Sequence, residues 1–204
     1  MKTKSHLVKL EAYLKKKILP DLKKGRPFWD KPRTVEVVAY VKRIIKHCPE
    51  LKLDQDVLII AAYAHDWGYS GLFKVKEVLN YEEVKDAKTQ HMIIGAKKTR
   101  KLLKDKFFNF LTVKQKQRCI HLVAIHDKVA ELKDVDEIVL MEADMLSGLD
   151  ANSVKPTFDA KSNKKFINEV KTKRLPKFIT GYSLKEAKKL IKVRMAYYRK
   201  NRLS

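Results

Sequence analysis

The sequence predicts an all-α protein with a single domain. Apolar residues recur at helical spacing along most of the 204-residue chain, and no long run alternates apolar and polar residues as a strand does. The six glycines and six prolines are too few for long linkers, and no internal repeat divides the chain. We therefore expect one helical bundle, with its core at about 29–150 and a helical C-terminal extension over 151–204.

Two helices are predicted in the first 48 residues. An amphipathic helix over 5–19 ends at Pro20, because proline lacks the N–H group that continues a helix. After a connector, Pro32 stands where a helix can begin, and helical spacing then runs over 33–48.

A third helix, beginning near 54–56 and ending near Gly68, is predicted to lie inside the core. Its residues 57–64 are apolar on every side, so the helix has no face suited to water. The helix ends on His65 and Asp66, which would then be largely buried. Because an unpaired buried carboxylate costs several kcal/mol, Asp66 needs a partner.

The rest of the chain predicts further helices joined by connectors. Thr112 precedes one of them as its expected N-cap, because a threonine hydroxyl accepts a hydrogen bond from the first helical turn. The region around Pro156 is less regular than its surroundings. The predicted helices cover 82–104, 112–128, 134–150, 161–173 and 183–200, the last two on the surface.

The formal net charge of +22 favours anionic partners such as phosphorylated substrates, nucleic acid or a membrane surface. However, only nine of the 46 basic residues are arginines. Phosphate and base recognition favours the arginine fork, so the excess of lysine favours a general enrichment in lysine over dedicated nucleic-acid binding. An ordinary anionic substrate would still gain from this field.

The sequence predicts a cytoplasmic protein without a membrane role. Cys48 and Cys119 form no disulfide framework, which favours two free thiols in a reducing compartment. The basic N-terminal 20 residues contain no apolar signal-peptide segment, and no apolar run reaches the roughly 20 residues that span a bilayer. The oligomeric state does not follow from the sequence.

Two aspartates lie where the chain has no basic residues. Lysine and arginine are absent from 53–73, which contains Asp66, and from 134–154, which contains Asp144. Asp144 follows Leu140 by four residues and so shares its apolar helix face. Core burial explains the missing lysines but not the aspartates, which require a cation from elsewhere. A divalent metal ion is one such cation.

Histidines could supply the remaining ligands of such an ion. His126 shares a helix face with Leu122 and Cys119 and so is expected to point inward. His91 is followed four residues later by Gly95, which allows another backbone to approach closely. A hydrogen-bonded core histidine is the alternative for each. The other histidines, His6, His47 and His121, are assigned to helix surfaces or helix ends.

Four segments in this order resemble the HD-domain superfamily of metal-dependent phosphohydrolases. They are "AAYAHDWGYS", "HMIIGAKKTRKLL", "LVAIHDK" and "LMEADMLSGLD", and the resemblance runs from about Trp29 to Asp150. A single His-Asp pair is a weak signal, but four elements in order and context are specific. The resemblance implies an all-α fold and metal-dependent hydrolysis of phosphate esters.

The resemblance also implies a ligand set. His65, Asp66 and Asp144 would hold one divalent metal ion, while His91 and His126 would hold a second ion or contact the substrate phosphate. Oxygen and imidazole ligands suit manganese, magnesium, iron, cobalt, nickel or zinc, and spacing does not choose among them.

The chain departs from the superfamily at the first metal-binding histidine. The segment "WDKPRTVEVVAYV" places Arg33 at that position, and a guanidinium cannot bind a metal ion. Arg33 would then either clamp a substrate phosphate, or pair with Asp66 or Asp144 and replace the charge of the metal.

The implied reaction is the attack of metal-activated water on a phosphomonoester or phosphodiester of a small nucleotide-like substrate. Asp66 could accept the proton of the water, and Arg33 could stabilise the phosphoryl charge. Asp127 and Lys128 follow His126 and could orient water or contact phosphate, although a solvated helix end is the alternative. A base could pack on aromatic residues after the His-Asp pair, although packing over the core is the alternative: Trp67, Tyr69 and Phe73.

Three other functions remain open from the sequence. The first is a non-catalytic HD-fold protein that binds an anionic ligand or partner, which Arg33 favours. The second is a di-iron oxygenase, which Arg33 counts against because two irons need a full ligand set. The third is a nuclease or RNA-binding protein, which only the net charge supports.

Overall fold

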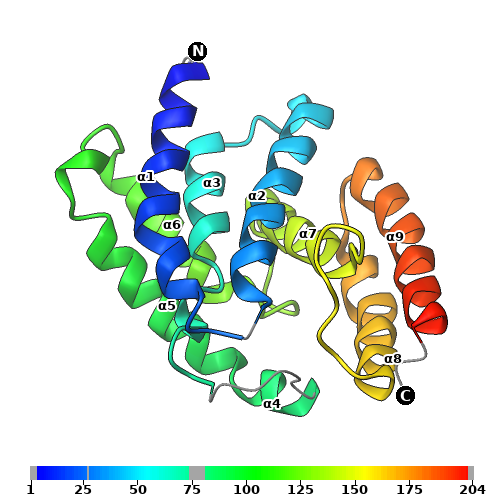
Figure 1. The fold of residues 1–204 in the computed structure, drawn as a ribbon. Helices are drawn as coiled ribbons and strands as arrows, with labels where there is room; N and C mark the ends of the chain where they lie inside the picture. Colours follow the sequence, from blue (N-terminus) through cyan, green and yellow to red (C-terminus); the bar gives the residue numbers. More distant parts are fainter. Residues whose placement is uncertain (1–3, 27, 74–80, 202–204) are drawn as a thin grey trace.

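The computed structural model describes residues 4–26, 28–73 and 81–201, and within these residues it contains nine α-helices and no strand (Figure 1). The expected all-α fold is confirmed. None of the described helices is long and apolar enough to cross a membrane. The α-helices are α1 Lys4–Leu22, α2 Asp30–His47, α3 Gln55–Ala64, α4 Tyr81–Asp86, α5 Lys88–Leu102, α6 Val113–Ile125, α7 Val135–Leu149, α8 Ala160–Glu169 and α9 Gly181–Lys200.

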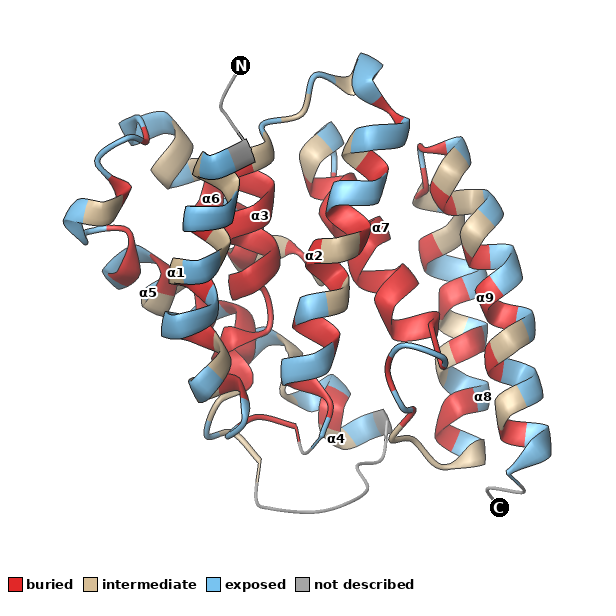
Figure 2. Ribbon diagram, turned by 45° about the horizontal axis from the view of Figure 1, so that its top comes forward, coloured by how far each residue is buried: buried red, intermediate tan, exposed pale blue. Residues whose placement is uncertain are grey.

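Two helices, α3 and α7, form the centre of the bundle and are buried along most of their length (Figure 2). Residues Val57–Ala64 of α3 are at most 2% exposed, so the predicted burial is confirmed. The expected end near Gly68 is wrong, because α3 ends at Ala64 and a separate 3-10 turn follows over Trp67–Tyr69. Helices α1, α2 and α6 pack around α3, and α5 packs against α6. Helix α7 packs on α2 and α9 and so joins the core to the C-terminal helices.

The expected end of the first helix at Pro20 is wrong. Helix α1 continues through Pro20 to Leu22. Proline removes one backbone hydrogen bond, but Ile18 and Leu22 on either side of it are fully buried. Their burial outweighs the loss of one bond in the last helical turn.

Of two expected helix boundaries, one differs from the prediction and the other agrees with it. The predicted helix over 82–104 is two helices, α4 and α5, with a break at Ala87. The expected N-cap of α6 is confirmed, because Thr112 Oγ1 accepts a hydrogen bond of 3.2 Å from the backbone N–H of Gln115.

The start of α7 is held by Glu137, whose side chain is only 5% exposed. It accepts hydrogen bonds from the backbone N–H groups of Lys133 and Asp134 at 2.8 and 3.1 Å. His121 Nε2 lies 2.8 Å and Arg118 Nη1 3.1 Å from its carboxylate. Burial alone would raise the pKa of Glu137, but these donors outweigh it and lower the pKa to about 2.

We expect Glu137→Gln to weaken the fold at neutral pH and not at pH 2. The folded-state pKa lies below the usual 4.5, so the charge of Glu137 stabilises the fold above about pH 4.5 and this stability is lost toward pH 2. Urea unfolding at pH 7 should show a loss of about 1–3 kcal/mol in the variant. A deficit that persists unchanged at pH 2.5 would contradict the role of the charge.

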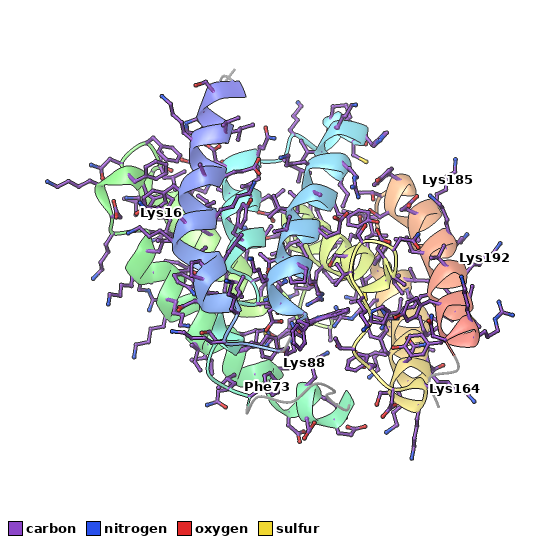
Figure 3. All side chains as sticks on the ribbon, in the orientation of Figure 1. Lys16, Phe73, Lys88, Lys164, Lys185 and Lys192 are labelled. Carbon is purple, nitrogen blue, oxygen red and sulfur yellow. The ribbon has the colours of Figure 1, made fainter. Side chains whose placement is uncertain are left out.

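The C-terminal extension packs on α7 through a buried arginine. Arg194 of α9 donates from Nη1 to the carbonyl of Gly148 at 2.6 Å and from Nε to Asn163 Oδ1 at 2.7 Å. These bonds join α9 to α7 and α8. A π-helical turn, η4 (Val170–Arg174), follows α8 and packs on α7. Most of the basic charge of this extension lies outside, as Lys164, Lys185 and Lys192 show by projecting into solvent (Figure 3).

Candidate functional site

A buried arginine bridges the two aspartates that the sequence singles out. Arg33 of α2 donates from Nη1 to Asp66 Oδ2 at 2.5 Å and from Nη2 to Asp144 Oδ1 at 2.5 Å. Asp66 follows the end of α3 and Asp144 lies on α7, so the guanidinium joins three helices. All three side chains are buried, and an ion pair of this kind is strongly held only when its geometry is good.

A second arginine, Arg26, also contacts Asp66, and no sequence pattern predicts this contact. Its Nη2 donates to Asp66 Oδ2, and its Nε and backbone N–H each donate to Asp30 at 2.6 Å. The guanidinium carbon lies 4.0 Å from the ring centre of Tyr69. Burial raises the pKa of Asp30 to about 6, despite Arg26. Asp66 Oδ2 therefore accepts hydrogen bonds from two guanidinium groups.

His65 completes this first cluster. Its Nδ1 lies 2.7 Å from the carbonyl of Ala62, and its Nε2 lies 3.2 Å from both Asp66 Oδ2 and Asp144 Oδ1. Burial opposes a charge on His65, but Asp66 and then Asp144 outweigh it and raise the pKa to about 10. Arg33 and a charged His65 together supply the positive charge that the two aspartates require.

Two other histidines form a second cluster on the opposite oxygen of Asp66. His91 Nε2 and His126 Nε2 lie 3.2 Å apart, and they lie 3.5 and 3.7 Å from Asp66 Oδ1. The Nδ1 of each ring faces a backbone carbonyl, at 2.9 Å for His126 and 3.4 Å for His91. Burial, followed by the effect of His126, lowers the pKa of His91 to about 3. Because His91 Nδ1 faces a carbonyl oxygen, a neutral His91 ring would carry its proton on Nδ1 and leave the lone pair of Nε2 toward His126 and Asp66.

In both clusters the ligand atoms lie close enough together to hold a divalent metal ion, and the second cluster fits one better. The three ligand atoms of Asp66, His91 and His126 are spaced much like ligands that lie about 2.0–2.1 Å from one tetrahedral ion. A cation would also relieve two facing imidazole nitrogens. At the first cluster, the guanidinium of Arg33 already occupies the space between the carboxylates.

Gly68 allows the helix that carries His91 to reach the end of α3. A Cβ atom on Gly68 would lie only 1.8 Å from the carbonyl oxygen of His91 and 2.7 Å from the backbone nitrogen of Gly95. The sequence predicts that another backbone approaches Gly95 closely, and this approach is present. The approaching backbone is that of Gly68. This backbone contact sets the distance between His91 and Asp66.

A cavity of about 50 Å³ opens beside the two clusters. Its charged lining comes from the core and from the C-terminal extension: Arg26, Arg33, Lys88, Asp127, Asp144, Glu169 and Arg174. Asp127 Oδ1 accepts a hydrogen bond of 2.7 Å from Arg174, and Asp127 Oδ2 lies 3.9 Å from His91 Nε2. Burial would raise the pKa of Asp127, but Lys88 and Arg174 outweigh it and hold the pKa well below its usual range.

The other expected site residues lie at different places. Lys128 is exposed, pairs with Glu131 at 3.2 Å and does not line this cavity. Tyr69 lines the cavity, whereas Trp67 donates to Asp21 at 3.0 Å. Phe73 lines a larger apolar cavity of about 530 Å³ next to it, which also includes Arg26.

Sequence reasoning missed several charged residues of the site: Arg26, Asp30, Lys88, Glu169 and Arg174. None of them lies in a motif, and only tertiary packing brings them together. Arg26 precedes a proline in the connector, and nothing there distinguishes it from the surface cations.

A family model described as HD domain matches residues 33–149, which is more than half of the chain. The match begins at Arg33 and ends at the C-terminus of α7, so it includes the histidines and aspartates of both clusters. It leaves out Arg26, α8, α9 and η4. No curated protein and no solved structure matches the chain.

Proposed function

The chain belongs to the HD-domain superfamily, and we propose from this that it is a metal-dependent phosphohydrolase that uses one divalent ion. The ion is held by Asp66 Oδ1, His91 Nε2 and His126 Nε2. The pair of facing imidazole nitrogens, 3.2 Å apart beside a carboxylate oxygen, is the observation that supports this most strongly. The substrate is a small phosphorylated, nucleotide-like molecule.

The charge of the site supports an ion in the second cluster. Five carboxylates lie in or behind the cavity: Asp30, Asp66, Asp127, Asp144 and Glu169. They are balanced by five positive groups: Arg26, Arg33, His65, Lys88 and Arg174. Because these charges balance, a divalent ion at the second cluster would add the positive charge that favours binding of a phosphoryl group.

The side chains around the ion divide the chemical work. A divalent ion provides Lewis acidity toward a phosphoryl oxygen and lowers the pKa of water. Asp66 Oδ2 is held by two guanidinium groups, so Asp66 acts as a ligand and not as the base. Asp127 Oδ2 remains available to accept a hydrogen bond from water near His91. Arg26 and Arg33 stabilise charge on the phosphoryl oxygens from the cavity wall.

One specific observation favours a second candidate, a non-catalytic HD-fold protein that binds an anion. Arg33 bridges Asp66 and Asp144 and takes the place that a metal ion would need between them. Such a protein would bind a phosphorylated ligand through the same cavity without hydrolysing it. Nucleic-acid binding has less support, because only nine of the 46 basic residues are arginines, whose forked guanidinium group suits phosphate and base recognition.

Phosphate release from p-nitrophenyl phosphate and a panel of nucleotides, with manganese present, tests the proposal. We expect turnover by wild type and by Lys128→Ala, a control outside the cavity, and a loss of about 100-fold or more in His126→Gln. Equal turnover in His126→Gln, or no turnover in wild type, would overturn the phosphohydrolase. Binding of a phosphorylated ligand without its hydrolysis would favour the second candidate, the non-catalytic anion-binding protein.

A further inference from the structure

Two cations and two carboxylates form a cluster on the side of the cavity that faces the C-terminal extension. Lys88 Nζ, from α5, lies 3.9 Å from Asp127 Oδ1 and 3.7 Å from Glu169 Oε1. Arg174, from η4, donates from Nη2 to Asp127 at 2.7 Å. Lys88 lies at the lower edge of the core (Figure 3). We call these four side chains the Lys88–Arg174 cluster.

Arg174 has an unused donor in this cluster. The side chain is only 4% exposed, and its Nη1 has no hydrogen-bond partner among the described residues. A buried guanidinium N–H without a partner is costly, because it has lost its hydrogen bond to water and forms no other hydrogen bond. Arg33 also lines this cavity, and its Nε is likewise buried without a hydrogen-bond partner among the described residues. An anion in the cavity would provide a hydrogen-bond acceptor for both of these N–H groups.

Glu169 is the loosely held member of the cluster. Its carboxylate lies 3.7 Å from Lys88 Nζ and 4.0 Å from Arg174 Nε, which is longer than a hydrogen bond. It is also the most exposed of the carboxylates that contact these cations, at 20% against 9% for Asp127. A carboxylate in that position can be displaced at lower cost than Asp127.

We propose that the C-terminal extension forms a second anion subsite. In this subsite, a phosphate or carboxylate group of the ligand replaces the Glu169 carboxylate between Lys88 and Arg174. The substrate then carries a second anionic group, a phosphate or carboxylate, in addition to the phosphoryl group that reacts. That statement about the substrate rests on the proposed function, whereas binding of an anion to the subsite does not.

The position of Arg174 supports a role specific to this chain. Arg174 and Glu169 lie outside residues 33–149, the part that matches the HD domain. Arg174 ends a π-helical turn, and such turns are uncommon and frequently occur at functional sites. Asp127 would raise the pKa of Lys88, but burial and Arg174 outweigh it and lower the pKa. The site therefore holds two cations close together at a cost, which a bound anion would offset.

Binding of inorganic phosphate to the metal-free protein, measured by calorimetry at constant ionic strength, tests the subsite. We expect Glu169→Gln to bind phosphate about fivefold or more tightly than wild type, because the competing charge is gone. Arg174→Met should bind about tenfold or more weakly, and Arg174→Lys should recover part of this loss. Lys128→Ala removes an exposed lysine of a neighbouring turn and should bind like wild type.

Two results would overturn the subsite. One is the same phosphate affinity in wild type, Glu169→Gln and Arg174→Met, and the other is no binding in any of them. If Arg174→Met does not fold, the gain in Glu169→Gln alone decides, because Glu169 makes no hydrogen bond-length contact with Lys88 or Arg174.

The same variants separate this proposal from the phosphohydrolase. Loss of metal binding or turnover with intact, Arg174-dependent phosphate binding would reject the enzyme and keep the subsite. In the turnover assay, inorganic phosphate should be a competitive inhibitor of the hydrolysis of a substrate with two anionic groups. Inhibition that is not competitive would reject the assignment of the subsite to the substrate.

Discussion

Arg33→His is expected to bind one more divalent ion per chain than wild type. The substitution removes the guanidinium from between Asp66 and Asp144 and provides an imidazole at the position where the superfamily is expected to have a metal-binding histidine. His65, Asp66 and Asp144 then lack their bridging cation, which a metal ion replaces. Elemental analysis after loading with manganese, and the rise in melting temperature with manganese, measure the effect.

Arg33→Met is the matched control for that variant. It removes the same charge but adds no strong ligand, so Asp66 and Asp144 remain without a bridge. We expect Arg33→Met to be about 3–5 kcal/mol less stable than wild type, which is the usual cost of breaking a buried ion pair. An Arg33→His variant with the metal content of wild type, or an Arg33→Met variant as stable as wild type, would contradict the role assigned to Arg33.

Gly68→Ala is expected to destabilise the protein by more than about 3 kcal/mol and to remove metal binding. The new methyl group would lie 1.8 Å from the carbonyl oxygen of His91, and this neighbour is backbone and cannot rotate away. Helix α5 would have to move outward and carry His91 away from Asp66. Thermal unfolding and metal content measure the two effects.

Gly181→Ala is the control for the glycine substitution. Gly181 is the first residue of α9, and no other part of the described chain comes within 4 Å of a Cβ atom placed on it. We expect its stability to be within about 0.5 kcal/mol of wild type. Wild-type stability and metal content in Gly68→Ala would show that the contact with α5 does not set the site.

The core and the position of the site could be predicted from local patterns. An apolar helix that ends on Asp66 must be buried, and a buried carboxylate needs a cation. The sequence could not choose that cation, because a metal ion and Arg33 satisfy the same charge. The choice depends on the distance between α2 and α3, which is a tertiary property.

The parts that could not be predicted depend on contacts between distant segments. Pro20 remains helical because Ile18 and Leu22 are buried, and helical spacing alone does not show this. Arg174 enters the cavity because α8 ends in a π-helical turn, for which the sequence has no clear signature. Arg26 looks like any surface cation until Asp30 and Asp66 surround it.

The metal content of three proteins tests the central claim most directly. Wild type, Asp144→Asn and His126→Gln are loaded with manganese, freed of excess metal by gel filtration and analysed for bound ions. If Asp66, His91 and His126 hold the ion while Arg33 occupies the other cluster, wild type and Asp144→Asn retain about one equivalent and His126→Gln retains none. No ion in wild type, or an ion that Asp144→Asn loses and His126→Gln keeps, would contradict the account.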